Sequence, residues 1–214
     1  MSGPSGRPAA RPVRIGLTGP IGCGKSTVAG WLGRRGAVVV DADVVAREVT
    51  APGTAGHDAV IAHFGDRVRS SDGSLDRPAL ARIVFSDVEA LGELEAIVHP
   101  LVRPRIVAAI DAAVAAGASA VAIEAIKLIE GGLHELCDEV WFVTCGDQRA
   151  RLIGRGMDPA DADRRIAAQA GMEAAALRAL GGRVTAVSTS GSLVEAEERV
   201  ARLWERVIGG PGAT

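Results

Sequence analysis

The stretch from Gly19 to Ser26, GPIGCGKS, constrains the fold more than any other part of the chain. It fits the pattern G-x-x-x-x-G-K-[ST], in which glycines let the backbone curl so that successive N–H groups face a phosphate. An apolar run, Val13 to Leu17, precedes it, and a helical pattern, Thr27 to Arg35, follows it. This order predicts a phosphate-binding loop that opens an α/β domain; the alternative is a glycine-rich turn that binds nothing.

The loop also supplies the residues that we expect to bind ATP. Lys25 would reach the β- and γ-phosphates, the Ser26 hydroxyl would ligate Mg²⁺, and the helix that follows adds its positive N-terminal end. Lys25 and Lys127 are the only lysines in the chain, so a compact ammonium at either position is a candidate functional group. The predicted ATP-binding set is Gly22, Cys23, Gly24, Lys25, Ser26 and Thr27.

Alternating strand and helix patterns predict the fold class. β-branched, apolar runs of strand length that do not alternate are typical of parallel strands buried on both faces. Strands separated by helical segments predict a three-layer α/β/α fold with a mainly parallel five-stranded sheet and right-handed crossovers. The expected strands are Val13–Leu17, Ala37–Val40, Ala118–Glu124, Glu139–Thr144 and Arg183–Val187.

The same patterns divide the chain into parts. We expect one domain over residues 13–208, with disordered tails at 1–12 and 209–214. Its core would comprise residues 13–43, 118–146 and 183–208, with a helical acceptor-binding lobe inserted at 44–117. Pro100 is expected in the first turn of a helix that runs to Ala116. The arginine-rich segment at about 147–170 is expected to form a helical lid, or else an ordinary solvated face.

Three carboxylates follow predicted strands. Asp41 and Asp43 come at the carboxyl end of the second strand, where ligands of open α/β sheets bind. Either could accept or orient the proton of a hydroxyl acceptor, or Asp41 could cap the next helix. Glu124 ends the third strand and is a candidate metal ligand beside Ser26, the alternative being a solvated carboxylate. His99 is either a functional group or a cap at the expected helix start.

Composition argues against several classes of protein. A formal net charge of −2 and an aromatic content of 3% disfavour nucleic-acid binding, which needs a basic excess or stacking platforms. The apolar runs are far shorter than the ~20 residues of a membrane helix, and no signal-peptide pattern is present. Cys23, Cys137 and Cys145 form no CxxC pair. We therefore expect a cytoplasmic protein, a monomer or weak homo-oligomer, without nucleic-acid or membrane partners, structural disulfides or zinc.

Several motifs together resemble the dephospho-coenzyme A kinase family. The resemblance rests first on Ile15–Thr27, IGLTGPIGCGKST, and on Val40–Arg47, VDADVVAR, and it extends to about Trp204. Many families share the phosphate-loop pattern, whereas D-A-D followed by A-R is far more specific. Further matches, in the family's order, are Ala51–Gly53, His63–Gly65, Asp72–Asp76, Val84–Phe85 and His99–Leu101.

The resemblance implies a kinase that uses ATP to phosphorylate the ribose 3′-hydroxyl of dephospho-CoA, the last step of coenzyme A synthesis. By motif matching, Asp43 is the candidate base, and Arg47 and His99, with Asp41, line the acceptor site. Arg155 would be the lid residue that faces the phosphates. Closure of the lid would exclude water and so strengthen these charge contacts.

The second half of the chain departs from the family's pattern. Glu124–Glu130, EAIKLIE, stands where the family has D-V-P-L-L-F-E, so the proline is lost and Lys127 is new. Gly171-Met172 and Ser188–Gly191 differ from the family's Ser/Thr-Arg and D-N-S-G. We hypothesise that Lys127 supplies positive charge near the acceptor or the γ-phosphate. The alternative is a lysine whose stem covers apolar surface at the end of a strand.

Three other functions are compatible with parts of the pattern. Another small-molecule or nucleoside kinase would share the loop but prefer a different acceptor. A GTPase would normally read guanine with an N-K-x-D motif, but the chain contains no asparagine. A degenerate relative would bind nucleotide or coenzyme A without turnover.

Overall fold

The computed structural model describes residues 11–209. They form two compact units. One comprises the described residues up to Val40 together with those from Ile110 onward, and the other comprises Asp41–Ala109. Residues 1–10 of the expected N-terminal tail and 210–214 of the expected C-terminal tail lie outside the described residues.

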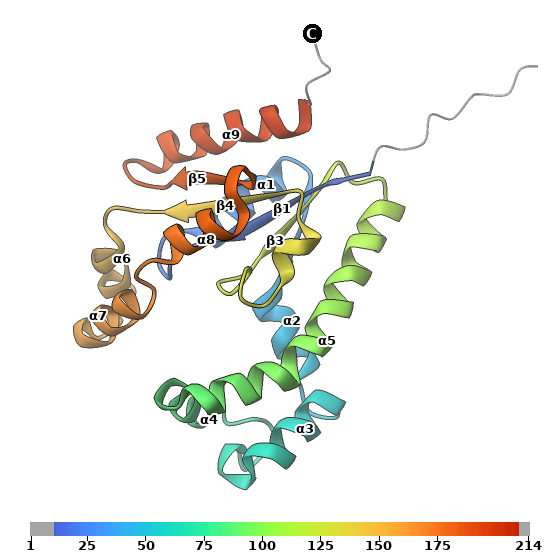
Figure 1. Ribbon diagram of the computed structural model, residues 1–214, viewed down its shortest axis with the longest axis vertical. Coiled ribbons are helices and arrows are strands. Elements are labelled where there is room, and N and C mark those ends of the chain that lie inside the picture. The colour runs from blue at the N-terminus through green and yellow to red at the C-terminus, as the bar shows by residue number, and fades with distance from the viewer. Residues whose placement is uncertain (1–10, 210–214) are drawn as a thin grey trace, which may run out of the picture. The chain divides into compact units, whose positions relative to one another are not determined.

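A five-stranded sheet forms the centre of the first unit, in the order β2-β3-β1-β4-β5 (Figure 1). β1 pairs in parallel with both β3 and β4, and β4 pairs in parallel with β5. The sheet lies between helices, as the sequence predicted for the fold class. The strands are β1 (Val13–Thr18), β2 (Ala37–Asp41), β3 (Ala120–Glu124), β4 (Glu139–Thr144) and β5 (Val184–Ser188).

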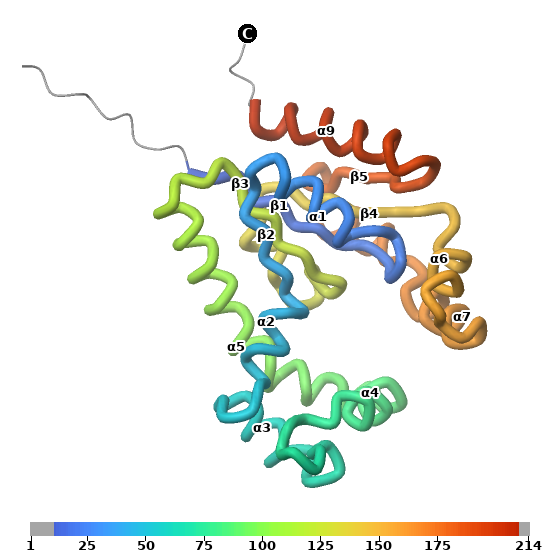
Figure 2. The backbone as a smooth tube through the Cα atoms, turned by 180° about the vertical axis from the view of Figure 1, so that it is seen from behind, coloured from blue at the N-terminus to red at the C-terminus, as the bar shows by residue number. Residues whose placement is uncertain are grey.

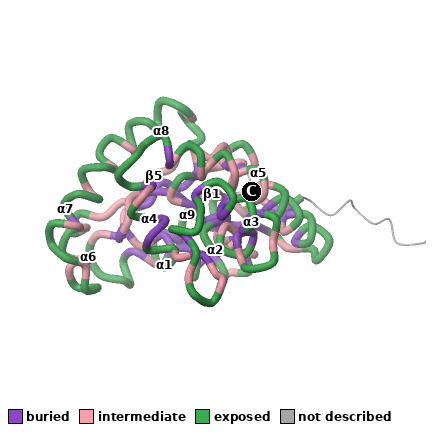
Figure 3. Tube along the Cα trace, turned by 90° about the horizontal axis from the view of Figure 1, so that it is seen from below, coloured by how far each residue is buried: buried purple, intermediate pink, exposed green. Residues whose placement is uncertain are grey.

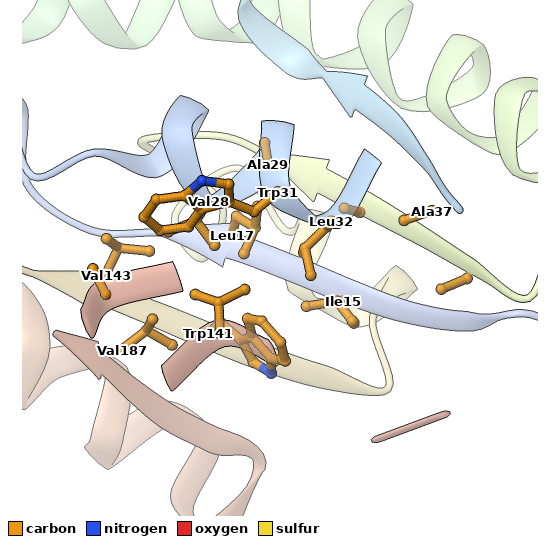
Figure 4. Packing of buried hydrophobic residues seen from close by; sticks show 14 of the residues in the cluster. Ile15, Leu17, Val28, Ala29, Trp31, Leu32, Ala37, Trp141, Val143 and Val187 are labelled. Atoms are coloured by element: carbon orange, nitrogen blue, oxygen red, sulfur yellow. The ribbon is translucent and has the colours of Figure 1, made fainter. Parts of the chain in front are cut away.

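Helices α1 (Lys25–Arg34) and α9 (Leu193–Gly209) cover one face of the sheet. Their apolar side chains pack with those of the strands in one cluster, in which Leu17 and Trp141 are fully buried (Figure 4). Figure 2, which views the molecule from behind, shows α1 in front of the sheet. Burial of this amphipathic face supplies most of the stability that such helices have in proteins.

The other face of the sheet is covered by α8 (Met172–Leu180) and by the segment that follows β3. Close packing there explains a glycine within β1. A Cβ on Gly16 would lie 2.6 Å from Leu128 and 2.9 Å from Cys137 Sγ, so that any larger residue would displace this layer. The sequence did not predict α8.

The second unit consists of α2 (Ala42–Val49), α3 (Ala55–Phe64), α4 (Arg77–Ser86) and the first part of α5 (Val88–Ala115). It has a core of its own, in which Val60, Phe64, Val68 and Leu80 are buried. Asp41, Thr54 and Asp76 each accept backbone hydrogen bonds at the start of a helix, which fixes where α2, α3 and α4 begin.

Helix α5 corrects one prediction. The sequence placed a helix start at Pro100, but α5 runs without a break through Pro100 and Pro104. Each proline lacks an N–H and so removes one hydrogen bond from the helix, at the carbonyls of Ala96 and Pro100. Packing before and after the prolines maintains the helix, since Val98 packs against the core of the second unit and Val102 and Ile106 are buried.

The arginine-rich segment forms two short helices, α6 (Gln148–Gly154) and α7 (Pro159–Ala168). Their surface is largely exposed (Figure 3), with Leu152 and Ala162 as the buried residues. Within residues 11–209, no helix is both long and apolar enough to cross a membrane.

Candidate functional site

The loop between β1 and α1 has the backbone that the glycine pattern predicts. Gly19, Gly22 and Gly24 have φ of 135°, 81° and 87°, in the left-handed region that favours glycine. Gly19 also lies close to β4, since a Cβ there would be 2.2 Å from the carbonyl oxygen of Val143. No side chain other than hydrogen fits at this position. Gly24 is the residue from which α1 starts.

Lys25 is buried within the loop, with 7% of its surface exposed. Its Nζ donates hydrogen bonds to the carbonyl oxygens of Gly19, at 2.8 Å, and Pro20, at 3.1 Å. The ammonium therefore spans the first turn of the loop and lies at the N-terminal end of α1. An anion in the loop would meet both the ammonium and the positive end of the helix.

Ser26 and Glu124 bring two oxygen ligands together at the edge of the sheet. The Ser26 hydroxyl donates to Glu124 Oε1 at 2.8 Å, and Glu124 is buried with 9% exposure. Hydroxyl and carboxylate oxygens are ligands of the kind that Mg²⁺ prefers, and Mg²⁺ usually takes one or two protein ligands with phosphates and waters. The pair fits such an ion, whereas residues 11–209 contain no cluster of three His, Cys, Asp or Glu that could hold a metal.

The cysteines correct a second prediction, because Cys23 and Cys145 form a disulfide. It joins the phosphate loop to the residue that follows β4, and the two Cα atoms lie 5.1 Å apart. A separation of 122 residues hid the pair from inspection of sequence spacing. The third cysteine, Cys137, is buried and free, and burial raises the pKa of its thiol to about 12. It is an inert packing residue.

Two glutamines that the sequence analysis missed hold the main chain of the loop. Gln169 Oε1 accepts a hydrogen bond from the Ile21 N–H at 2.8 Å, and Gln148 Nε2 donates to the Ile21 carbonyl, also at 2.8 Å. Gln148 begins α6 and Gln169 follows α7. The two ends of this helical pair are thus attached to a single residue of the phosphate loop.

Thr189, which follows β5, was likewise not predicted as a site residue. It is 5% exposed, and its hydroxyl lies 2.8 Å from the carbonyl oxygen of Cys23. Arg151 donates to the Thr189 hydroxyl at 3.0 Å and to its carbonyl oxygen at 2.7 Å. Asp147 in turn accepts from Arg151 Nε at 2.8 Å. No local sequence signal identifies such a network, because its members are far apart in the chain.

A pocket of about 510 Å³ lies beside the loop in the first unit. This is within the range of small-molecule sites. Residues of the loop, of the end of β4 and of α8 line it, among them Pro20, Cys23, Thr144, Gln148, Gln169 and Met172.

The candidate acceptor residues Asp41, Asp43, Arg47 and His99 belong to the second unit. Asp41 Oδ1 accepts from the backbone N–H groups of Asp43, at 2.8 Å, and Val44, at 3.2 Å, and so caps α2. Asp43 and Arg47 are exposed and four residues apart in α2, hence on the same face of the helix. His99 is half-buried within α5 and does not lie at a helix start.

Two other predicted residues are exposed on the first unit. Lys127 lies in the turn after β3, three residues beyond Glu124. Arg155 is the residue at which α6 ends. It lies between α6 and α7, and so between the two anchored glutamines in the chain.

Comparisons with known proteins agree on one family. A sequence model of the family described as dephospho-CoA kinase matches residues 13–181. The dephospho-CoA kinase of Symbiobacterium thermophilum is 42% identical over 201 residues, which cover 92% of this chain and 82% of the relative. That of Streptomyces avermitilis is 44% identical over 200 residues, which cover 92% and 94%. The solved structure of TT1252 from Thermus thermophilus has a TM-score of 0.74 at 32% identity, with coverage of 91% and 97%.

Proposed function

Because this chain belongs to the dephospho-CoA kinase family, we propose that it transfers the γ-phosphoryl group of ATP to the ribose 3′-hydroxyl of dephospho-CoA. The products are coenzyme A and ADP. The observation that carries the proposal is the phosphate loop itself, with Lys25 buried inside it and the Ser26–Glu124 pair beside it. Phosphoryl transfer depends on positioned charge of this kind.

On the ATP side, the backbone of Gly22–Thr27 would surround the phosphates at the start of α1. Lys25 would exchange its bonds to the Gly19 and Pro20 carbonyls for bonds to the β- and γ-phosphates. Ser26 and Glu124 would hold Mg²⁺, which neutralises phosphate charge when bound. Arg155 would approach the phosphates from the helical lid formed by α6 and α7.

On the acceptor side, Asp43 is the stronger candidate for the base. Asp41 already accepts two backbone hydrogen bonds at the start of α2, so its carboxyl group is engaged in capping the helix. Asp43, exposed in the same turn, would accept or orient the proton of the 3′-hydroxyl. Arg47, on the same face of α2, and His99 would bind the acceptor, and Lys127 would add positive charge near it.

The family role also suggests the setting in which the chain works. Its substrates are small molecules, and we place the reaction in the cytoplasm, with the chain as a monomer or weak homo-oligomer that needs no nucleic acid or membrane.

The test is incubation of the protein with ATP, Mg²⁺ and dephospho-CoA, followed by detection of coenzyme A by mass spectrometry. Nucleosides and small alcohols offered in parallel would identify another acceptor if the proposal is wrong. ATP binding without transfer to any acceptor would identify a chain that only binds nucleotide. In an active protein, D43N is expected to lower kcat with little change in KM for ATP, and D41N to act mainly on stability. Full turnover in D43N would move the role of base to Asp41.

A further inference from the structure

We propose that Thr189 is a positioning residue for ATP, which fixes the Cys23–Gly24 peptide so that the Gly24 N–H faces the phosphates. The proposal rests on the function proposed above and assigns a role to a residue at which this chain departs from its family. Thr189 does not touch the nucleotide in this role. It acts through the main chain of the loop.

The first step concerns the direction of one hydrogen bond. A threonine hydroxyl has a single proton and two lone pairs. Arg151 Nη1 donates to the Thr189 oxygen at 3.0 Å, and a guanidinium can only donate. The hydroxyl proton is therefore left for a carbonyl, and the Cys23 oxygen at 2.8 Å is nearer than the Thr144 oxygen at 3.2 Å. Arg151 thus directs the hydroxyl of Thr189 toward the phosphate loop.

The second step concerns the peptide that this hydroxyl holds. A planar trans peptide points its C=O and its N–H in opposite directions. Holding the Cys23 carbonyl on the Thr189 side therefore turns the Gly24 N–H to the opposite side. Gly24 has a φ of 87° and no Cβ, so its neighbouring peptides would rotate more freely than those of other residues. The bond from the Thr189 hydroxyl restricts this rotation and so favours one orientation of the amide.

The third step is proximity. A Cβ on Gly24 would lie 3.6 Å from Thr189 Oγ1 and 3.8 Å from Arg151 Nη1, so both groups lie directly against the loop. A purely structural role for Thr189 is already filled by its backbone, whose N–H donates to the Thr144 carbonyl at 2.8 Å. Any residue could make that bond. The bond to Cys23, in contrast, needs the hydroxyl, which also accepts from Arg151.

The experiment compares three variants by steady-state kinetics and by calorimetric binding of ADP. T189V keeps the shape but removes the hydroxyl, which leaves the buried Cys23 carbonyl without its donor. We expect KM for ATP and Kd for ADP to rise roughly tenfold, with KM for dephospho-CoA within twofold of wild type. T189S retains the hydroxyl and is expected to stay within twofold for all three values.

T185V is the matched control. Thr185 lies in the same strand as the residue before Thr189, and its hydroxyl bonds to Glu139 and Arg206 away from the loop. This variant suffers the same chemical change, so it reports the effect of general destabilisation. We expect unchanged KM for ATP. T189V with the ATP and ADP values of wild type, or T185V with the same rise as T189V, would overturn the proposal.

Two further arms keep the test decisive. If T189V does not fold, R151M removes the donor that directs the hydroxyl and should raise KM for ATP by a smaller factor; wild-type KM in R151M would then contradict the proposal. Wild-type protein that makes no coenzyme A in this assay would refute the proposed function. Active wild-type protein with an unaltered T189V would refute only the role of Thr189.

Discussion

Lys25 is both buried and charged, and these two properties determine how strongly its replacement should affect catalysis. Only 7% of its surface is exposed, and two backbone carbonyls of the loop accept from its Nζ. Charged groups in such positions cost free energy unless they are bonded, and they interact strongly with an incoming anion because little water screens them. Few residues outside a functional site combine these properties.

We predict that K25M lowers kcat/KM for ATP by a factor of roughly a hundred or more, because positioned charge supplies much of the catalysis of phosphoryl transfer. Coupled detection of ADP measures the effect. R34M, which removes an exposed cation from the same helix, is the control and should stay within twofold of wild type. Comparable losses in both variants would indicate damage to α1 rather than a role in the reaction.

At the residue scale, the sequence identifies a functional residue when the residues it acts with lie close to it along the chain. The glycines, Lys25 and Ser26 follow from one eight-residue pattern with a known physical basis. Cys145, Gln169 and Thr189 do not, because each meets the loop from more than 120 residues away, as the disulfide and the hydrogen bonds to Ile21 and Cys23 record. Only a fold that brings the carboxyl ends of β1, β4 and β5 to one edge shows these contacts.

At the scale of elements, the helical pair α6–α7 is attached to the phosphate loop at both of its ends. Gln148 and Gln169 bind opposite groups, the carbonyl and the N–H, of Ile21. A lid built on these helices would therefore move between two fixed ends, with Arg155 in the part that lies between them.

We predict that Q169L speeds the hydrogen exchange of the Ile21 amide, since this amide loses its acceptor. Residue-level exchange measured by NMR provides the readout. Q148L is the matched control, because it removes the donor to the Ile21 carbonyl and leaves the amide bonded. Equal acceleration in the two variants would mean that the helical pair opens as a whole and that the individual bonds do not matter.

Prediction of the elements from sequence was accurate where the pattern is long and regular. The strands follow from buried β-branched runs, and β4 has the predicted bounds. The predicted helix start at Pro100 was wrong, since a proline inside a long helix can bend the helix without ending it. Helix α8 was not predicted because Met172–Leu180 is rich in alanine. Its few polar residues do not show the alternation of polar and apolar faces that identifies a helix in a sequence.

At the scale of the whole molecule, the disulfide closes a long loop of the chain. It links residues 122 apart, and in the chain-entropy account such a cross-link stabilises the fold by roughly 4–5 kcal/mol through the unfolded state. We predict that reduction lowers Tm by roughly 10 °C, measured by circular dichroism with and without a thiol reductant. C145A should show the lower Tm under both conditions. A wild-type Tm that does not respond to reductant, with both thiols shown to be free, would contradict the prediction.

A second long-range contact, the ion pair of Arg14 in β1 with Asp138 just before β4, should make the stability of the fold depend on pH. Burial alone would raise the pKa of Asp138, but hydrogen bonds and charge from Arg14, together with the charge of Arg11, outweigh burial and hold this pKa below its usual value. Arg14 Nη2 lies 2.9 Å from Asp138 Oδ1. A carboxyl with a lowered folded pKa stabilises the protein above its unfolded pKa, near 3.9, and loses this contribution as the pH falls through the folded value.

We therefore predict that D138N lowers Tm at pH 7 and that the difference from wild type narrows as the pH falls below about 4. Thermal unfolding at pH 7, 5, 4 and 3 measures it. D163N is the control, since the pair of Asp163 with Arg149 is exposed and should contribute little at any pH. A Tm difference that stays constant across this range would assign the effect of Asp138 to packing alone.

The helical unit Asp41–Ala109 enters the chain as one uninterrupted insertion, between two strands that are neighbours in the sheet. Its helices have a separate core, and the phosphate loop shares no residue with it. If Asp43, Arg47 and His99 in this unit bind the acceptor, as we propose, most of the acceptor site is encoded in a different stretch of the gene from the phosphate loop. Replacing this one segment with that of a related kinase is then a direct route to a new substrate, with the machinery for ATP left as it is.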